Sequence, residues 1–377
     1  MLEVADILRL HGAAYRARFG DRLLPSQVRA MRDIEACRTA LLGGHLKLCD
    51  HCGHKVYTYH SCRNRHCPKC HRDQTERWLG KQRARLLPCP YFLLTFTLPS
   101  ELRPLARTHQ KKLYGLLMTC AVAALQKLCL DPRHLGVRLG CLAVLHTWTR
   151  ALLYHPHVHL LVTAGGLSAD RTQWIEPRRS LDPRTPRFLV PVQALSILFR
   201  AKLGAALKRA KLLDQVPPQV WKKDWVVHCQ PAGRGDKVLD YLGRYVFRIA
   251  ITNGRLEQIE NGQVTFRYRD NRSQKLRRVT LPAEEFIGRF LQHVLPRGCA
   301  KVRYYGIWAG SCRQQLEQAR ALLSARPPTG SDPCTPVAPL PGPVVVQVPP
   351  APACCPQCRI GHLIVIEVLL PHRKFPP

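Results

Sequence analysis

The stretch "YHPHVHLLV", Tyr154 to Val162, places three histidines at alternate positions inside an apolar run. Alternate residues of an extended strand point to the same side, so His155, His157 and His159 would share one face. The valine and leucine residues between and after them would occupy the other face. Such a row of imidazoles on a rigid strand indicates a metal site, a catalytic site, or histidines that are hydrogen-bonded in the core.

These three possibilities predict different chemistry. One or two core histidines would need only hydrogen-bond partners. A histidine-triad nucleotide hydrolase also alternates histidine with apolar residues, and there a histidine attacks a nucleotide phosphate. In the third possibility His157 and His159 hold a divalent cation beside a DNA phosphate. The rest of the chain distinguishes between them.

Charge is the strongest bulk signal. The chain of 377 residues has 58 Lys and Arg against 25 Asp and Glu, a net charge of +33, and 46% hydrophobic residues. A folded protein with such an excess of positive charge favours phosphate-rich partners, and nucleic acid is the first expectation. An anionic membrane surface is less favoured, because no continuous basic amphipathic helix with a large apolar face is found.

The location follows from the same scan. No hydrophobic run approaches the roughly 18 residues that span a bilayer, and the first twenty residues resemble an amphipathic helix and not a signal peptide. We therefore expect a cytoplasmic, nucleoid-associated protein without a membrane partner. Its 17 cysteines would stay reduced there, so clustered cysteines are metal ligands before they are disulfides.

Cysteines cluster in "CDHCGHKVYTYHSCRNRHCPKC", which begins at Cys49 and ends at Cys70. Two C-x2-C pairs separated by fourteen residues predict one tetrahedral zinc site with four ligands: Cys49, Cys52, Cys67 and Cys70. Cys62 and His66 are further candidates as ligands. Eight basic residues lie in or beside this segment and indicate contact with DNA: Lys47, Lys55, Arg63, Arg65, Lys69, Arg72, Arg77 and Lys81.

The remaining pattern mixes strands and helices. Strand-like runs at 91–98, 139–148 and 155–164 alternate with helical stretches at about 101–130 and 192–213. This predicts an α+β fold with a central, largely antiparallel sheet flanked by helices, preceded by a small zinc-binding domain. The predicted domains are 1–84, an N-terminal helix with the zinc-binding domain, and 85–325, the nuclease domain.

The end of the chain has a different composition. Residues 327–352 include ten prolines, so 326–353 is predicted to be an extended linker. Residues 354–377 form a short tail with one C-x2-C at Cys355 and Cys358. This is half a zinc site, which Cys334, Cys354 or His362 could complete, and a hairpin without metal is the alternative.

A second motif decides between the interpretations of the histidines. In "DYLGRYVFRIAI", Asp240 to Ile251, Tyr241 and Tyr245 are four residues apart and would share one face of a helix. Arg244 and Arg248 accompany the pair and would contact DNA. A tyrosine hydroxyl has a pKa of about 10, and nearby cations stabilise its phenolate. Histidines that hold a metal, together with two tyrosines on a basic helix, favour the breaking and rejoining of single-stranded DNA.

At this point a family resemblance is apparent. The chain resembles, over nearly its whole length, the transposases of the insertion-sequence-91 family, which are rolling-circle enzymes with a His–hydrophobic–His (HUH) nuclease. Seven segments in the same order carry the resemblance: "SCRNRHCPKC", "TFTLP", "LHTWTRALLYHPHVHLLVTAGGL", "YLGRYVFRIAITNGRL", "VTFRYRD", "EEFIGRFLQHVLPRG" and "VRYYGIWA".

The resemblance implies functions for particular residues. His157 and His159 correspond to the family's metal ligands, and Tyr241 and Tyr245 to its nucleophiles. It further implies metal-dependent cleavage and strand transfer of single-stranded transposon DNA through 5′-phosphotyrosine intermediates, with Mg²⁺ or Mn²⁺ at the nuclease site and structural Zn²⁺ in the N-terminal domain. The expected partner is single-stranded DNA at the transposon ends and target, with no small-molecule cofactor. His155 or His146 could be a third metal ligand.

Two classes of alternative remain open. A plasmid replication initiator or a conjugative relaxase would use the same chemistry. A zinc-dependent DNA-binding protein without nuclease activity would keep the basic surface and the cysteines but would form no covalent link to DNA.

Overall fold

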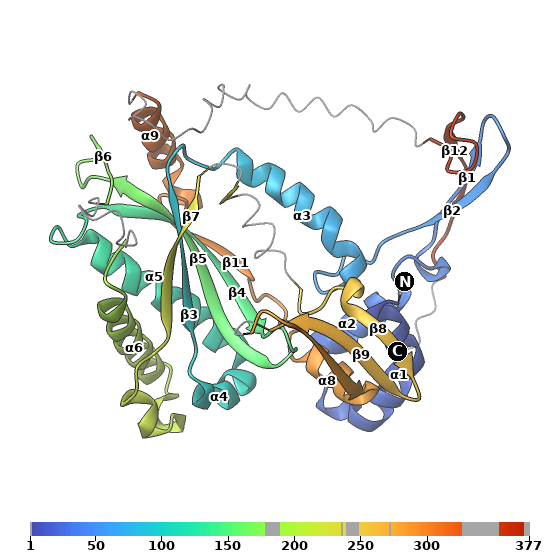
Figure 1. Cartoon of the computed structure of the whole chain (residues 1–377), viewed down its shortest axis with the longest axis horizontal. Helices are drawn as coiled ribbons and strands as arrows, with labels where there is room; N and C mark the ends of the chain where they lie inside the picture. Colours follow the sequence, from blue (N-terminus) through green and yellow to red (C-terminus); the bar gives the residue numbers. More distant parts are fainter. Residues whose placement is uncertain are drawn as a thin grey trace.

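A computed structural model of the chain describes residues 2–177, 189–234, 237–238, 249–270, 273–325 and 354–372. Figure 1 shows a large sheet with helices on one side of the view, and a helix-rich lobe with a smaller sheet on the other. A third sheet projects from the helix-rich lobe. The α+β class predicted from the sequence is confirmed.

The large sheet carries the histidines. Its strand order is β11-β4-β5-β3-β7, with β6 paired to β5, and every neighbouring pair is antiparallel. The strands are β3 (Tyr91–Thr97), β4 (Arg138–Trp148), β5 (Tyr154–Leu167), β6 (Trp174–Ile175), β7 (Val227–Gly233) and β11 (Val302–Gly306). The histidine strand β5 therefore lies in the middle of the sheet, and the sheet is antiparallel, as the sequence predicted.

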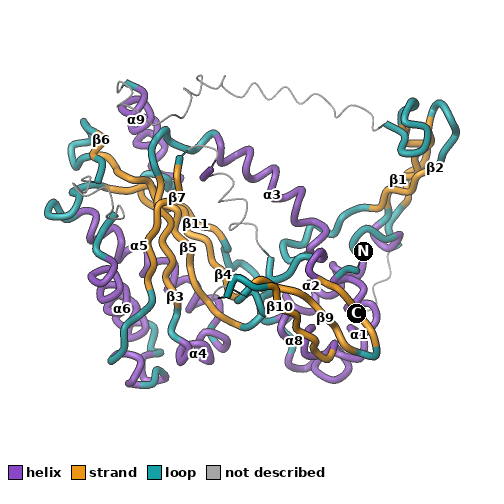
Figure 2. Tube along the Cα trace, viewed as in Figure 1, coloured by secondary structure: helices purple, strands orange, loops and turns teal. Residues whose placement is uncertain are grey.

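Three helices cover one face of this sheet (Figure 2): α4 (Arg103–Thr108), α5 (Gln110–Leu130) and α6 (Val192–Arg209). The alternate residues Val158, Leu160 and Val162 of β5 pack with them in one hydrophobic core. The alternation of apolar residues along β5 thus buries one side of the strand under the helices. The histidines at the intervening positions face the opposite side of the sheet.

Helix α5 is the described helix that is long and apolar enough to cross a membrane by length and composition. This corrects the expectation that no apolar run approaches that length. However, 61% of its most apolar window is buried inside the protein, and Leu117, Met118 and Leu125 pack in the core under the sheet. α5 is therefore the central helix of the core.

The face of the sheet that carries the histidines has its own, smaller core. Helix α9 (Arg313–Ser324) and the end of α3 (Pro68–Arg83) contribute Leu323 and Trp78. Leu142 of β4 and Leu161 of β5 pack against them, and so does Val238. Val238, the described residue that precedes the segment with the two tyrosines, is thus buried on the histidine face.

A separate core joins the N-terminal helices to a small sheet. Helices α1 (Val4–Phe19) and α2 (Pro25–Ala36) pack with strands β8 (Leu256–Glu260), β9 (Gln263–Arg269) and β10 (Leu276–Pro282) and with helix α8 (Ala283–Leu291). In α8, acidic Glu284 and Glu285 lie in the first turn and Arg289 in the last, which complements the helix dipole. One face of α8 buries Phe286 and Phe290 in this core.

The projecting sheet is formed by both ends of the chain. Strands β1 (Gly44–Cys49) and β2 (Lys55–Tyr59) form an antiparallel hairpin. Strand β12 (Leu363–Leu369), from the C-terminal tail, pairs antiparallel with the other edge of β1. Short 3-10 turns complete the described elements: Gly20–Arg22, Ala40–Leu42, Ser100–Leu102, Leu213–Gln215, Pro218–Trp221, Asn253–Arg255 and Gly310–Cys312.

Candidate functional site

Three histidines come together on the side of the central strands that faces away from α4, α5 and α6. His157 and His159 lie on β5, and His146 lies on β4, where it is directly opposite His157 in the antiparallel register. The three residues can each offer a ring nitrogen within 4.8 Å of the others. His146 is 3% exposed and His159 is 9% exposed. The sequence named His146 only as one of two possible third ligands, because a lone histidine on an apolar strand is no distinctive signal.

Neighbouring groups fix the orientation of two of these rings. The Nδ1 atom of His159 is 3.0 Å from Oγ1 of Thr95, which lies opposite it on β3. The Nδ1 atom of His157 is 2.7 Å from the carbonyl oxygen of His155. These contacts hold both rings in a defined orientation. A metal-binding histidine is commonly held in this way by a partner on its other nitrogen. Sequence reasoning missed Thr95, since its role depends on cross-strand pairing.

The protonation state of these histidines suits the binding of a cation. Burial lowers the pKa of His157 to about 4, so its imidazole is neutral near pH 7 and keeps a lone pair. No carboxylate belongs to this group within the described part of the chain. The donor set is therefore three imidazoles, which suits a divalent transition-metal ion better than the oxygen-preferring Mg²⁺.

The first histidine of the strand has a different role. Nη2 of Arg103 donates a hydrogen bond to Nδ1 of His155 at 2.8 Å. Burial and the positive charge of Arg103 lower the pKa of His155. His155 is therefore fixed at the start of the strand by Arg103, and it is not part of the three-histidine group.

Trp148 closes one side of the group. Its ring stacks on His146, with centroids 4.8 Å apart and an interplanar angle of 26°. Nζ of Lys301 is 5.5 Å from the Trp148 ring centroid. One face of the Trp148 ring is thus covered by His146. Trp148 thereby links the histidine group to a neighbouring buried pocket.

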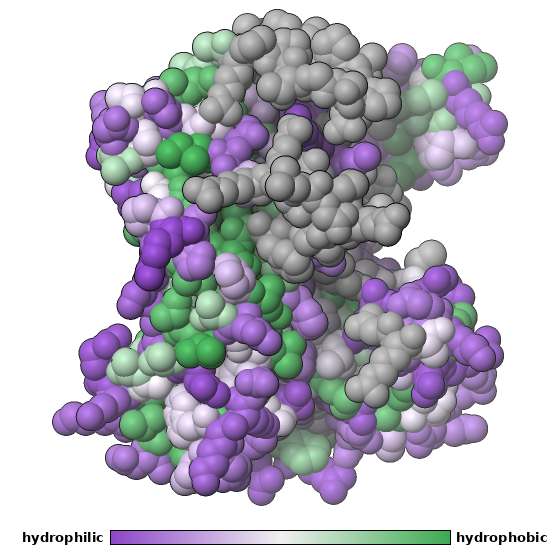
Figure 3. Space-filling view, turned by 60° about the vertical axis from the view of Figure 1, so that its left-hand side comes forward, coloured by the Kyte–Doolittle hydropathy of each residue, from purple (hydrophilic) through white to green (hydrophobic). Residues whose placement is uncertain are grey.

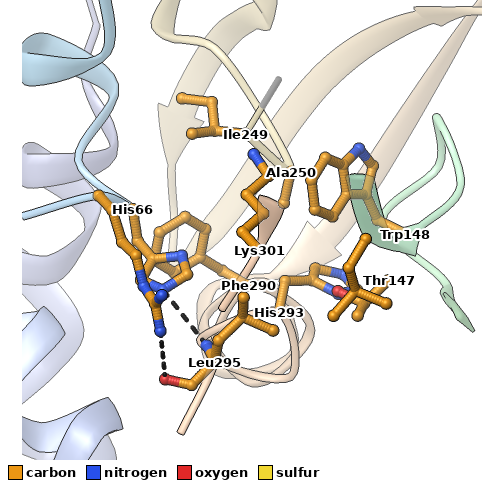
Figure 4. Close-up of a pocket in the computed structure, with 11 residues that line it drawn as sticks. His66, Thr147, Trp148, Ile249, Ala250, Phe290, His293, Leu295 and Lys301 are labelled. Atoms are coloured by element: carbon orange, nitrogen blue, oxygen red, sulfur yellow. Dashed lines mark hydrogen bonds between the residues drawn. The ribbon is translucent and has the colours of Figure 1, made fainter. Parts of the chain in front are cut away.

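Figure 4 shows this pocket, with His66, Trp148, Ala250, His293 and Lys301 among the residues that line it. Burial lowers the pKa of Lys301 to about 7 and that of His293 to about 4. Polar groups of His66, His293 and Lys301 thus meet in a pocket beside Trp148 that also has apolar walls.

Four residues predicted to be catalytic or to bind DNA lie outside the described part of the chain: Tyr241, Tyr245, Arg244 and Arg248. The structure describes residues on either side of this segment. Val238 is buried on the histidine face of the sheet, and Ala250 lines the pocket beside Trp148. The roles of the two tyrosines and two arginines stay predictions.

The cysteines form two groups of four: Cys37, Cys62, Cys67 and Cys70 in one, and Cys49, Cys52, Cys355 and Cys358 in the other. This corrects the single site predicted from Cys49, Cys52, Cys67 and Cys70. The physical reason is the hairpin between the two C-x2-C pairs. Strand β2 is five residues long, or about 17 Å, and it carries the first pair away from the second.

The first cysteine group lies between two helix ends. Cys37 is the C-cap of α2, and Cys67 and Cys70 are at the N-terminus of α3. The sulfur of Cys70 is 3.5 Å from that of Cys37 and 3.6 Å from that of Cys62. Hydrogen bonding, with that from Cys62 the largest cause, lowers the pKa of Cys37 to about 7. Hydrogen bonds from Cys37 and from the other two thiols lower the pKa of Cys70. The pKa values of Cys62 and Cys67 are raised, in both cases mainly by hydrogen bonding with Cys37.

This geometry is suited to a structural zinc ion. Four sulfurs converge, and the N-terminus of α3 favours negative charge on the nearby Cys70, whose pKa is lowered. Sequence reasoning missed Cys37, because it has no second cysteine beside it in the sequence to mark it as a ligand.

Comparison with known proteins agrees with this arrangement. A family model described as "Transposase zinc-binding domain" matches residues 7–98, and one described as "Putative transposase" matches residues 140–315. "Putative transposase y4qJ" of Sinorhizobium fredii is 41% identical over 394 aligned positions, which cover 97% of this chain and 95% of that protein. "Transposase for insertion sequence element IS801" of Pseudomonas savastanoi pv. phaseolicola is 30% identical over 319 positions, covering 79% and 76%. No solved structure matches.

The chain belongs to the insertion-sequence-91 family of transposases. The resemblance inferred from the sequence motifs is thus confirmed, and with it the presence of a zinc-binding domain at the N-terminus. The sequence left Cys62 and His66 as further candidate zinc ligands, and the structure of this domain distinguishes between them.

Cys62 is one of the four converging sulfurs, but His66 is not. Nε2 of His66 accepts a hydrogen bond from the N–H of Leu295 at 3.2 Å, which is drawn in Figure 4. Burial, together with the charges of Arg65 and Lys301, lowers the pKa of His66 to about 3. His66 therefore joins the zinc-binding domain to the part of the chain matched by the transposase model, and its Nε2 atom is not available to zinc.

Two of the eight basic residues near the cysteines are also used inside the molecule. Nη1 of Arg65 donates to the carbonyl oxygen of Cys299 at 2.7 Å, and Lys69 forms an ion pair with Glu3 at 2.5 Å. Lys81, in contrast, is exposed on α3. Figure 3 shows hydrophilic residues over much of the outer surface of one face of the transposase. The large net charge thus leaves basic residues at the surface for a polyanion.

Proposed function

We propose that this transposase cleaves and joins single-stranded DNA by rolling-circle-type transposition, through 5′-phosphotyrosine intermediates. The observation that carries the proposal is the buried group of His146, His157 and His159. These three residues can each offer a ring nitrogen within 4.8 Å of the others, and the two tyrosines of the family motif, Tyr241 and Tyr245, are present in the chain.

In this proposal the three imidazoles bind a divalent cation. Mg²⁺ or Mn²⁺ held there would polarise a scissile phosphate and orient it for in-line attack. Thr95 and the carbonyl oxygen of His155 keep the imidazoles in place before DNA arrives. Because little reorganisation is then needed, the electrostatic stabilisation of the phosphate is built into the fold.

The tyrosines supply the nucleophile. The phenol oxygen of Tyr241 or Tyr245 attacks the phosphorus, a bond from this oxygen to the 5′-phosphate forms, and the bond to the 3′ oxygen breaks. The phenol proton is lost, and the departing oxygen takes up a proton to become a 3′-hydroxyl. One ester replaces another, so no external energy source is required. Arg244 and Arg248 stabilise the phenolate and the phosphate by their charge.

Two tyrosines permit successive transfers. While one holds the first cleaved end, the other can attack a second site, or the freed 3′-hydroxyl can attack the phosphotyrosine link and rejoin the strand. A DNA substrate and the charge of +33 support a cytoplasmic, nucleoid-associated location for the reaction.

A covalent-trapping assay tests this proposal. Purified protein is mixed with labelled single-stranded DNA from both flanks of its gene and Mn²⁺ or Mg²⁺, and then separated on a denaturing gel. We expect a DNA–protein adduct that weakens in Tyr241→Phe and in Tyr245→Phe and is lost in the double variant. Tyr268→Phe, which changes a tyrosine of β9 in the small sheet, is the matched control and should leave the adduct unchanged.

The outcomes separate the proposal from its alternative. If the protein binds the DNA but forms no adduct with any flank or either metal, it is a zinc-dependent DNA-binding protein without nuclease activity. If the adduct persists in the double tyrosine variant, another nucleophile is used and the assignment of the tyrosines is wrong.

A further inference from the structure

The second cysteine group joins two parts of the chain that are far apart in sequence. Cys49 and Cys52 lie at the tip of the β1–β2 hairpin, and Cys355 and Cys358 lie in the C-terminal tail. The sulfurs of Cys49 and Cys358 are 3.7 Å apart, and so are those of Cys52 and Cys355. Cys49 is 2% exposed and Cys355 is 1% exposed.

These separations match one metal centre. Four sulfurs at about 2.3 Å from a zinc ion occupy the corners of a tetrahedron whose edges are about 3.8 Å. The separations of 3.7 Å are close to this edge. The same holds for the zinc-binding-domain group, where the separations are 3.5 and 3.6 Å.

The two C-x2-C turns have the same backbone form. The N–H of Gly53 donates to the carbonyl oxygen of Cys49 at 3.1 Å, and the N–H of Arg359 donates to that of Cys355 at 3.0 Å. Gly53 and Arg359 each follow the second cysteine of their pair, and both have positive φ, +71° and +59°. In both turns the chain therefore curls around its sulfurs, and arginine accepts a left-handed conformation that it seldom adopts.

Backbone N–H groups also point at the sulfurs. The N–H of Cys52 is bonded to Sγ of Cys49 at 3.4 Å, and the N–H of Gly361 to Sγ of Cys358 at 3.4 Å. Such bonds stabilise negative charge on sulfur, which a metal-bound thiolate carries.

The tail is seated tightly against the hairpin beside the sulfurs. The N–H of His362 donates to Oδ1 of Asp50 at 2.7 Å, and the N–H of Asp50 donates to the carbonyl oxygen of His362 at 3.1 Å. A Cβ atom at Gly361 would lie 2.6 Å from Sγ of Cys49. The absence of a side chain at Gly361 is thus what lets the tail approach the sulfur this closely.

Hydrophobic burial does little to hold the tail. Strand β12 pairs with β1, but Ile364 is 48%, Ile366 48% and Val368 61% exposed. A strand with so much apolar surface still in contact with water gains little from burial, so another interaction is required to fix it. A structural zinc ion commonly supplies folding free energy of this kind.

We propose that Cys49, Cys52, Cys355 and Cys358 bind a second structural Zn²⁺, which fastens the C-terminal tail to the N-terminal hairpin. The two halves of the site are 303 residues apart, from Cys52 to Cys355, so the site is complete only when both ends of the chain are present. The residues predicted to form a proline-rich linker connect these ends, and the zinc ion closes the chain on itself. This inference does not depend on the proposed nuclease chemistry.

Zinc content measured by native mass spectrometry and elemental analysis tests this proposal on the full chain. We expect two zinc ions in the wild type and one in Cys355→Ser/Cys358→Ser. Cys49→Ser/Cys52→Ser should lose the same single ion, and so should the variant with all four substitutions, because both pairs belong to one site. Cys354→Ser is the matched control, since this neighbouring cysteine is exposed and outside the group; it should keep both ions.

Several results would overturn the proposal. One is that Cys355→Ser/Cys358→Ser retains both zinc ions, and another is that the fourfold variant loses more zinc than either pair. A third is that these thiols form disulfides in protein purified under reducing conditions, seen as a lower intact mass. The zinc ion of the first group, retained in every variant, shows that the N-terminal domain is still folded.

A second measurement checks the fastening directly. A protease site is placed within residues 327–352 and cut in the purified, zinc-loaded protein. The tail fragment should co-elute with the rest of the chain until a chelator is added, and Cys355→Ser/Cys358→Ser should release it without chelator. Release of the wild-type tail while zinc is still bound would contradict the proposal.

Discussion

Replacing Thr95 with valine should weaken metal binding at the histidine group without removing a ligand. The substitution keeps the β-branched shape of the side chain but removes the hydroxyl that is 3.0 Å from Nδ1 of His159. His159 is 9% exposed, so little water can replace the lost partner. Loss of such an outer partner typically reduces metal affinity by about 10- to 100-fold, which corresponds to about 1.4 to 2.7 kcal/mol.

Calorimetric titration with Mn²⁺ measures this effect. We expect the dissociation constant of Thr95→Val to rise by about 10- to 100-fold, and covalent adduct formation to recover at high Mn²⁺. Thr97→Val is the matched control. Thr97 lies on β3, as Thr95 does, and is opposite His157 of β5. However, Nδ1 of His157 is already bonded to the carbonyl oxygen of His155. Equal Mn²⁺ affinity in Thr95→Val and wild type would refute the reasoning, as would an equal loss in Thr97→Val.

Three further predictions follow from the same geometry. His146→Ala should lower Mn²⁺ affinity by more than about 100-fold, because it removes a ligand and not only an outer partner. His155→Ala should leave this affinity largely unchanged, and equal losses in the two variants would mean that His155 is a metal ligand as well. Burial holds the pKa of His293 at about 4, below the value of about 6.5 in the unfolded chain. Between these two pH values the folded protein binds fewer protons than the unfolded chain. The free energy of unfolding should therefore fall as the pH drops from about 6.5 to about 4, by up to about 3 kcal/mol. Urea unfolding at pH 7 and pH 4.5 should show this, and His293→Gln should reduce the difference; an unchanged pH dependence would contradict it. Cys37→Ser should lower zinc affinity so that one ion per chain is lost on dialysis, while Cys312→Ser, outside both groups, should retain it; retention in both would exclude Cys37 as a ligand.

Much of the large sheet could be predicted from local patterns. The strand predicted at 91–98 corresponds to β3 (Tyr91–Thr97), and that at 155–164 lies within β5 (Tyr154–Leu167). Alternation of apolar residues along a strand reports which side is buried, and this information is contained in a few consecutive residues. The helix predicted at about 101–130 is interrupted at His109, where α4 ends and α5 begins.

The candidate site could be predicted only in part. The spacing of His157 and His159 shows that they share a face, whichever strands lie beside them. The participation of His146 depends on the register between β4 and β5, and that of Thr95 on the register between β3 and β5. Registers between strands are set by the packing of whole elements, so no short stretch of sequence contains them.

The sequence by itself determined the α+β class, the family, the pair of histidines on one side of a strand, and the local C-x2-C turns. Only the tertiary structure decided which cysteines share a centre. Cys49 and Cys52 have their own turn in any arrangement, but the length of the hairpin separates them from Cys67. The pairing of β12 with β1 then brings Cys355 to them from the other end of the chain. A turn is encoded by neighbouring residues, whereas a metal site is completed by any segment that the fold brings within reach.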